Sequence, residues 1–234
     1  MTMNTPIVVM KRYELKYILD AGQTEYLTER LCGHMREDDY GLTPIASLYY
    51  DTPDARLIRT SVEKPEFKEK IRLRSYGLAT QDSPVFLELK RKAYGVVYKR
   101  RVQSVIPTVE SFFRGERDGF EGGQIDRELL YFREYYRNLE PTCLILYDRT
   151  AYYEPDGDLR LTIDRNPRYR TEDLRLDASM DGAPLLGPGE AILELKIQQA
   201  IPLWLTDILA CGSIRQGSIS KYGEVYKRRL LPGA

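Results

Sequence analysis

The chain of 234 residues contains one histidine and three widely separated cysteines. A single histidine excludes metal centres built from several histidines and argues against a Ser-His-Asp triad, so we interpret His34 as a surface or cap residue. Cys32, Cys143 and Cys211 are odd in number and sparse. This pattern favours buried thiols in a reducing compartment over a disulfide framework or a zinc site.

Glycine-rich phosphate-binding motifs are also absent. The sequence has neither G-x-x-x-x-G-K-[ST] nor G-x-G-x-x-G, so neither a P-loop nor a dinucleotide-binding fold is indicated. Ser218 to Lys221 matches S-x-x-K, but the S-D-N and K-T-G motifs that accompany it in β-lactamases are missing. The β-lactamase interpretation is therefore weak.

Net charge is absent as well, because 35 basic residues balance 35 acidic ones. The total charge gives no general attraction to polyanions, so an electropositive site must arise by clustering. No basic patch studded with aromatic residues is visible, although the chain has 18 tyrosines. We therefore do not expect nucleic-acid binding.

Long hydrophobic runs are missing too. The N-terminal residues lack a signal-peptide pattern, because Pro6 and few apolar residues precede Lys11. The apolar stretch from Ile201 to Cys211 carries Asp207 and is about half of the roughly 20 residues needed to span a bilayer. These features predict a cytoplasmic, soluble protein with no membrane segment in this chain.

Three segments of residues 67–102 alternate charged and apolar side chains. Cations alternate with aliphatics from Lys70 to Arg74, and Phe86 to Lys90 repeats the pattern with a carboxylate beside a cation. A third segment, VVYKRRV, ends at Val102. Because side chains of a strand point alternately to opposite faces, each segment has one apolar and one charged face.

The rest of the chain predicts further strands and several helices. Strands are expected at 8–17, 45–51, 142–152, 159–166 and 192–197, with a hairpin turn at 154–157. Asp20 offers an N-cap for a helix over 21–35, and Thr52 or Pro53 can open a helical turn through Ile58. Other helices are expected at 109–113, 124–138, 202–211 and 221–229. This is one β-rich α+β domain over 1–234, with a helical insert at about 107–140.

The charged faces have two interpretations. A one-sided antiparallel sheet normally turns a polar face to water, and lysine, arginine and glutamate are ordinary there. However, Glu-Leu-Lys recurs at 14–16, 88–90 and 194–196, and the charged positions are almost purely arginine, lysine and glutamate. A closed sheet with this face inward would give a cation-lined lumen that suits a polyphosphate chain and a divalent metal.

The order of the motifs resembles a known family over about Lys11 to Arg229. The motifs are RYELKY, SLYYDTPD, KIRLRSYG, VFLELKRK, VYKRR, LYDRTAYY, LRLTIDRN, ILELKI and SISKYGEVYKR. In this order they resemble the VTC domain, the polyphosphate-polymerase domain of the CYTH superfamily of triphosphate tunnel metalloenzymes. The resemblance implies an antiparallel β-barrel of about eight strands around a charged tunnel, with helices packed outside.

The resemblance also implies an activity and its residues. The γ-phosphoryl of ATP would join a growing polyphosphate chain, with Mn²⁺ or Mg²⁺ bridging the phosphates and Glu194 holding the metal. The matching catalytic positions are Lys16, Arg72, Arg74, Lys90, Lys99, Arg149 and Lys221. Tyr147 and Ser220 match substrate-binding positions. Four further residues share inward parity with all of these and are second-rank candidates for substrate binding: Glu14, Glu88, Arg101 and Asp164. Which two of the three cations at 99–101 face inward stays open.

Two departures from the family bear on the activity. Superfamily hydrolases typically open with E-x-E-x-K, whereas here Arg12 replaces the first acid, and Lys196 stands where the late strand has a second acid. Fewer carboxylates favour chain elongation over water activation, but triphosphate hydrolysis and non-catalytic polyphosphate binding remain alternatives. The family's membrane helices and phosphate-sensing domain are also missing from this chain. Either the product enters the cytoplasm, an unidentified membrane or product-handling partner receives it, or another triphosphate is the substrate.

Overall fold

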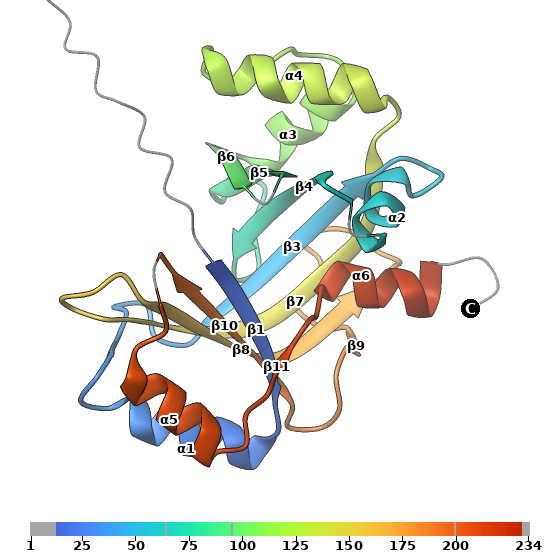
Figure 1. Cartoon of the computed structure of the whole chain (residues 1–234). Coiled ribbons are helices and arrows are strands. Elements are labelled where there is room, and N and C mark those ends of the chain that lie inside the picture. The colour runs from blue at the N-terminus through green and yellow to red at the C-terminus, as the bar shows by residue number, and fades with distance from the viewer. Residues whose placement is uncertain (1–12, 64, 95, 199, 231–234) are drawn as a thin grey trace, which may run out of the picture.

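A computed structural model describes all residues except 1–12, 64, 95, 199 and 231–234. The chain forms one curled antiparallel sheet (Figure 1). Its main path runs in the order β11 (Gln216–Gly217), β1 (Tyr13–Leu19), β10 (Ala191–Ile197), β8 (Arg160–Arg170), β7 (Glu140–Tyr153), β3 (Thr43–Asp51), β4 (Phe67–Tyr76), β5 (Val85–Ala93) and β6 (Val96–Ser104). Two short strands pair off this path, β2 (Arg36–Glu37) with β7 and β9 (Ala183–Pro184) with β8.

The predicted barrel is confirmed only in part. The sheet is antiparallel and curled, but it has eleven strands instead of about eight, and β6 does not pair with β1 among the described residues. The three extra strands, β2, β9 and β11, are each two residues long, which is too short to leave a period-two pattern in the sequence. The sheet therefore encloses its concave side without closing through backbone hydrogen bonds.

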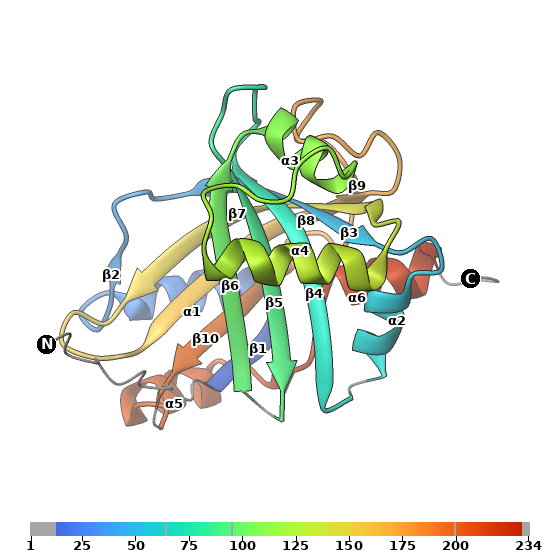
Figure 2. The same cartoon turned by 90° about the horizontal axis from the view of Figure 1, so that it is seen from above.

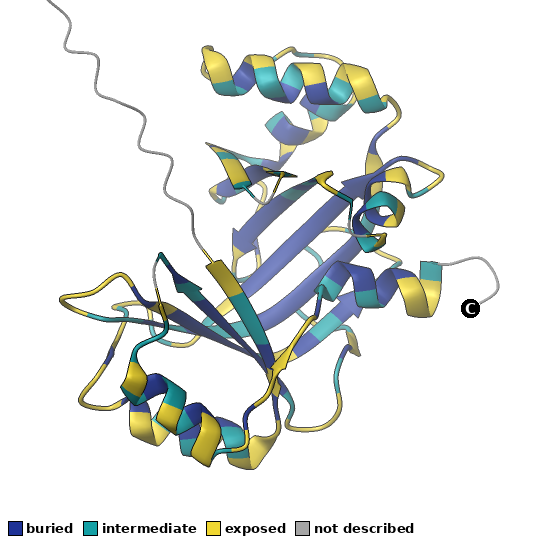
Figure 3. Ribbon diagram, in the orientation of Figure 1, coloured by how far each residue is buried: buried dark blue, intermediate teal, exposed yellow. Residues whose placement is uncertain are grey.

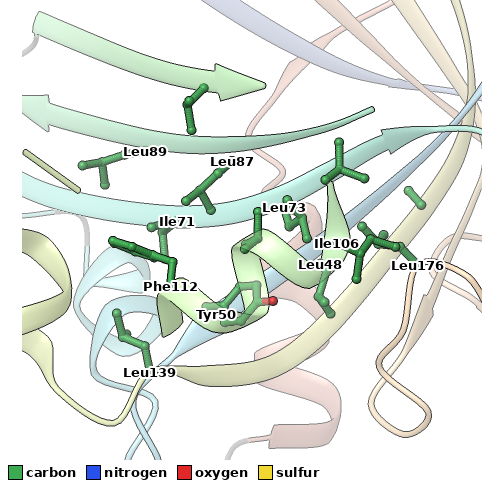
Figure 4. Packing of buried hydrophobic residues seen from close by; sticks show 14 of the residues in the cluster. Leu48, Tyr50, Ile71, Leu73, Leu87, Leu89, Ile106, Phe112, Leu139 and Leu176 are labelled. Atoms are coloured by element: carbon green, nitrogen blue, oxygen red, sulfur yellow. The ribbon is translucent and has the colours of Figure 1, made fainter. Parts of the chain in front are cut away.

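Helices cover the convex side of the sheet in two pairs. Helices α1 (Ala21–Leu31) and α5 (Leu203–Cys211) bury apolar side chains against β1, β10 and β8. Helices α3 (Ile106–Phe113) and α4 (Gln124–Tyr136) pack over the β4–β6 half, and Figure 2 shows α4 crossing these strands. The residues of this second layer, including Leu73, Leu87 and Phe112, interdigitate in Figure 4. Figure 3 shows buried strands and exposed outer helix faces.

One predicted outer helix instead packs on the concave side. The C-terminal segment forms α6 (Lys221–Val225) followed by a π-helical turn, η1 (Tyr226–Leu230). Tyr222, Val225 and Tyr226 are buried against concave-face side chains of β3 and β7, among them Tyr49 and Tyr147. The prediction of a helix at 221–229 is confirmed, but the prediction that all helices lie outside is wrong for this one. Helical periodicity cannot specify which side of a sheet a helix covers.

Helix α2 (Arg56–Val62) begins later than the predicted Thr52 or Pro53. The buried carboxylate of Asp51 explains the delay, because it accepts hydrogen bonds from the backbone N–H groups of Thr52, Leu57 and Ile58 at 2.8, 2.8 and 2.9 Å. The carboxylate thus satisfies donors of the first helical turn from the preceding strand. The Tyr222 hydroxyl donates to the same carboxylate at 3.0 Å, which ties α6 to the sheet.

Most other predicted elements agree with the structure within a few residues. Asp20 caps α1 with a capping box that includes Gln23, as expected, although α1 ends at Leu31 before the predicted residue 35. The predicted first strand began at Val8, and its residues 8–12 lie outside the described part of the chain.

Replacing Tyr222 by phenylalanine is expected to lower the free energy of unfolding by about 1 kcal/mol, because it removes one buried hydrogen bond to Asp51. Urea unfolding followed by circular dichroism measures the change. Tyr135→Phe is the matched control, since its hydroxyl lies on the exposed side of α4 and accepts from Arg56. Equal stability of the two variants would contradict the structural role of the Tyr222 hydroxyl.

Candidate functional site

The charged faces of the strands meet on the concave side of the sheet. Cross-strand pairing aligns Arg72 with Glu88 and Glu88 with Arg101, so these side chains share one face. Lys90 lies opposite both Lys70 and Lys99 and belongs to the same face. This register shows which two of the three cations at 99–101 face inward. Lys99 and Arg101 point to the concave side, whereas Arg100 contacts Glu128 of α4 on the other side.

Glu88 is the centre of the wall formed by β4, β5 and β6. Its side chain is 1% exposed and contacts four cations. Arg72 and Lys99 approach it to 2.8 and 2.7 Å. Arg101 and Arg74 lie at 3.1 and 3.8 Å. Burial alone would raise the pKa of Glu88, but the neighbouring cations hold it well below its usual range.

The opposite wall consists of β1 and β10. Glu194 pairs with Lys196 at 2.7 Å and Lys16 at 3.5 Å, while Glu14 pairs with Lys16 at 3.2 Å. Burial would raise the pKa of Glu194, but the two ammonium groups hold it well below its usual value. Lys90 of β5 reaches across to Glu14 at 3.2 Å, so the two walls are linked by this ion pair.

A third group connects the walls through β7, β8 and α6. Arg149 binds both oxygens of the buried Asp164 carboxylate at 2.6 and 2.8 Å, and Lys221 contacts the same carboxylate. Burial would raise the pKa of Asp164, yet Lys221 and Arg149 lower it to about 2. The Lys221 ammonium also lies 4.4 Å from the centre of the Tyr147 ring. The hydroxyl of Tyr147 accepts a hydrogen bond from Arg74 at 3.1 Å.

The structure brings all fourteen site residues expected from the sequence to this one face. They are Glu14, Lys16, Arg72, Arg74, Glu88, Lys90, Lys99, Arg101, Tyr147, Arg149, Asp164, Glu194, Ser220 and Lys221. Their assigned roles stay predictions, because proximity alone does not distinguish catalysis from binding.

Three further residues of the same face were missed. Lys70 donates to the Ser220 hydroxyl at 3.1 Å, Tyr49 accepts from Arg72 at 3.0 Å, and Lys196 pairs with Glu194. Lys70 and Lys196 could have been found, because they share parity with Arg72 and Glu194. Tyr49 could not, because the IASLYYD strand is buried on both sides and shows no alternation.

A divalent metal fits this face only together with phosphates. The described residues contain no group of three or more carboxylate, histidine or cysteine side chains that could hold a metal alone. Mg²⁺ is commonly held by one or two carboxylates plus substrate phosphates and water. Glu194 and Glu14, which share the Lys16 ammonium, supply such carboxylates.

Hollows elsewhere on the molecule differ in character from this face. One of about 660 Å³ lies between α2 and α4, lined by Arg56, Tyr131 and Tyr135 among others. Another of about 450 Å³ lies between α3 and residues 174–177. In these hollows the carboxylates Glu69, Glu128 and Asp177 are themselves paired with arginines. The concave face is where cations from separate strands converge.

A curled antiparallel sheet with cations on its concave side and helices outside defines a CYTH-type triphosphate tunnel fold. Solved structures with this fold include a putative adenylate cyclase from Bacillus halodurans, with a TM-score of 0.57, 14% identity and coverage of 94% of this chain and 99% of that one. Another is a putative adenylyl cyclase from Hippeastrum with a dominant triphosphatase activity, at a TM-score of 0.52 and 16% identity, covering 94% and 97% of the two chains. At 14% and 16% identity, the similarity to these two structures shows a shared fold only.

Within this fold class the chain belongs to the VTC domain family, whose model matches residues 11–229. It is also 26% identical over 208 residues to subunit 4 of the vacuolar transporter chaperone complex of Schizosaccharomyces pombe. That match covers 70% of this chain and 29% of the relative, so the chain spans less than a third of the relative's length. The described helices are all too short or too polar to cross a membrane.

Proposed function

We propose that the protein is a metal-dependent polyphosphate polymerase, which transfers the γ-phosphoryl of ATP to a growing polyphosphate chain on its concave face. The observation that carries the proposal is the imbalance of charge on this face. In the network of charged side chains described above, ten cations outnumber the four carboxylates Glu14, Glu88, Asp164 and Glu194. The ten cations are Lys16, Lys70, Arg72, Arg74, Lys90, Lys99, Arg101, Arg149, Lys196 and Lys221.

The excess of cations suits a long phosphate chain. The guanidinium groups of Arg72, Arg74 and Arg149 are held in place by Glu88 and Asp164, so they are oriented before any ligand arrives. Arginine binds phosphate oxygens in pairs, and lysine adds mobile point charges. Because phosphoryl transfer depends mainly on positioning and charge neutralisation, such a preorganised face supplies what the reaction needs from the protein.

The metal would be Mn²⁺ or Mg²⁺, with Glu194 as its main protein ligand and Glu14 as a second candidate. When bound, it would supply Lewis-acid neutralisation of the phosphates. The chain's own residues align the donor and acceptor phosphates along the cationic walls. A terminal phosphate of polyphosphate is already ionised at neutral pH, so the acceptor requires no general base from the protein.

Hydrolysis of triphosphates is the second candidate, and the Hippeastrum relative with triphosphatase activity favours it. Against it, all four carboxylates are engaged by cations, and the pKa of Glu194 is held well below its usual range by Lys196 and Lys16 despite burial. A carboxylate so stabilised in its ionised form is a weak base for activating water. Non-catalytic polyphosphate binding is the third candidate. The proposed partners are ATP, polyphosphate and a product-handling protein, and the cytoplasmic location stays a prediction.

The purified protein incubated with ATP and Mn²⁺ is expected to produce ADP and a polyphosphate ladder on a stained gel. Free orthophosphate is measured in the same reaction, and a Lys90→Ala, Arg72→Ala double variant is the inactive control. Release of orthophosphate without a ladder would show that the protein is a hydrolase and not a polymerase. Saturable polyphosphate binding with neither product would show that it binds polyphosphate without catalysis.

A further inference from the structure

Lys70 differs from the other nine cations named above. Within the described part of the chain, each of those nine contacts a carboxylate, whereas Lys70 contacts a hydroxyl. Its hydrogen-bond partner is the hydroxyl of Ser220, at 3.1 Å. A half-buried ammonium without a counter-charge is energetically unfavourable, so this position carries a cost that an anionic ligand can remove.

We infer that Lys70 and Ser220 form a phosphate-binding position of their own, distinct from the carboxylate-paired cations, which holds one phosphoryl group of a polyphosphate or triphosphate. The inference rests on the proposed function, because it assumes that phosphates bind to the concave face. An ammonium has three N–H donors, and Ser220 uses one of those on Lys70. The Ser220 oxygen accepts from Lys70 and from the Gly223 backbone, so its own O–H stays free to donate.

The surroundings of Lys70 are strongly electropositive. The groups that face it are the hydroxyls of Tyr49 from β3 and of Ser220 at the N-cap of α6, and the ammonium groups of Lys16 from β1, Lys68 from β4 and Lys90 from β5. A phosphate bound to Lys70 would therefore also be attracted by the lysines of three strands. A carboxylate ligand of the same charge would leave more of these donors unused, because phosphate offers more acceptor oxygens.

Binding at this position should be coupled to proton uptake. Burial, reinforced by the neighbouring lysines and opposed by Tyr49, lowers the pKa of Lys70 to about 8. A bound phosphate favours the charged ammonium and raises the pKa again. At pH 8 about half of the ligand-free molecules are neutral at Lys70, so binding takes up roughly 0.5 proton there, and almost none at pH 6.

The test is isothermal titration of tripolyphosphate into the full chain with EDTA present, so that no turnover occurs. Each titration is run in two buffers with different ionisation heats, which reports the protons exchanged. Tripolyphosphate itself exchanges protons on binding, so the measured quantity is the difference between the wild type and Lys70→Arg. Arginine keeps the charge but does not titrate. The wild type is expected to take up about 0.5 proton more than Lys70→Arg at pH 8, with no difference at pH 6.

Lys70→Met is expected to weaken binding at pH 7 by roughly tenfold or more. Lys227→Met, which removes an exposed lysine paired with Glu224, should bind like the wild type. Ligand-free Lys70→Met should be at least as stable as the wild type in thermal unfolding, because it removes an uncompensated charge. Its weaker binding would then not reflect misfolding.

Wild-type affinity in Lys70→Met, or identical proton exchange in wild type and Lys70→Arg at pH 8, would overturn the inference. Neither result depends on catalysis. If no polyphosphate ladder forms from ATP while the Lys70 effects are present, the proposed polymerase activity fails and the phosphate position stands. If a ladder forms but Lys70→Met binds tripolyphosphate like the wild type, the polymerase activity stands and the Lys70 phosphate position fails.

Discussion

Replacing Glu194 by glutamine is expected to lower metal-dependent turnover by at least about 100-fold, because the substitution removes the carboxylate that we propose as the main protein ligand of a phosphate-bound metal. The rate of polyphosphate formation from ATP across a range of Mn²⁺ concentrations measures the effect. Glutamine has the same shape, and Lys16 keeps its second carboxylate partner, Glu14. The fold should therefore remain intact.

A loss of activity in Glu194→Gln could also arise from displaced lysines, and binding separates the two causes. In EDTA the variant should bind tripolyphosphate as tightly as the wild type or more tightly, since a negative charge has left a cationic face. Displaced lysines would weaken that binding. Glu25→Gln, an exposed substitution on α1, is the control for both measurements. Full activity of Glu194→Gln would show that the metal assignment is wrong.

Glu88→Gln is expected to lower the free energy of unfolding by about 3 kcal/mol. Glu88 is the common partner of four cations, and without its charge Arg72, Arg74, Lys99 and Arg101 repel one another. Lys99 and Arg101 are 46% and 35% exposed, so water screens part of this repulsion. The expected loss of stability is therefore smaller than for a fully buried ion pair. Chemical unfolding at pH 7 measures the change.

Low pH and bound polyanions should both reduce the difference in stability between the wild type and Glu88→Gln. The cations hold the pKa of Glu88 well below its usual range, so its contribution is present above the unfolded-state pKa of about 4.3 and is lost as the pH falls. The wild type and the variant should therefore converge as the pH falls below the unfolded-state pKa toward the lowered pKa of Glu88 in the folded protein. Tripolyphosphate should stabilise the variant more than the wild type, because it replaces the missing charge.

The control for Glu88→Gln is Glu116→Gln, which breaks an exposed, solvent-screened ion pair with Arg114 and should leave stability almost unchanged. Equal stability of the two variants would mean that Glu88 does not organise the wall. A defect in Glu88→Gln that tripolyphosphate leaves unchanged would point to packing as its origin.

The sequence predicted which face of each strand is charged, because a period of two needs no tertiary information. It could not predict which strands meet. The Lys90–Glu14 pair joins residues 76 positions apart, and no local pattern specifies that contact. The inward packing of α6 depends on Tyr222 reaching the buried Asp51, which periodicity does not reveal. The order of the motifs was enough to predict the fourteen site residues. Lys70 was recognised only from the structure, through the pairing of β4 with β5 and the contact with Ser220.

The lack of backbone pairing between β6 and the β1–β11 edge has a mechanical consequence. In a closed barrel, strand number and stagger fix the diameter through continuous backbone hydrogen bonding. Here the described strands of the two edges are not hydrogen-bonded to each other, and the Lys90–Glu14 pair that links the walls is 45% and 28% exposed. Separating such a pair costs about 0–1 kcal/mol. Side-chain contacts therefore hold the two walls of the concave face together, and their separation can change around a ligand without breaking a backbone hydrogen bond between the described strands.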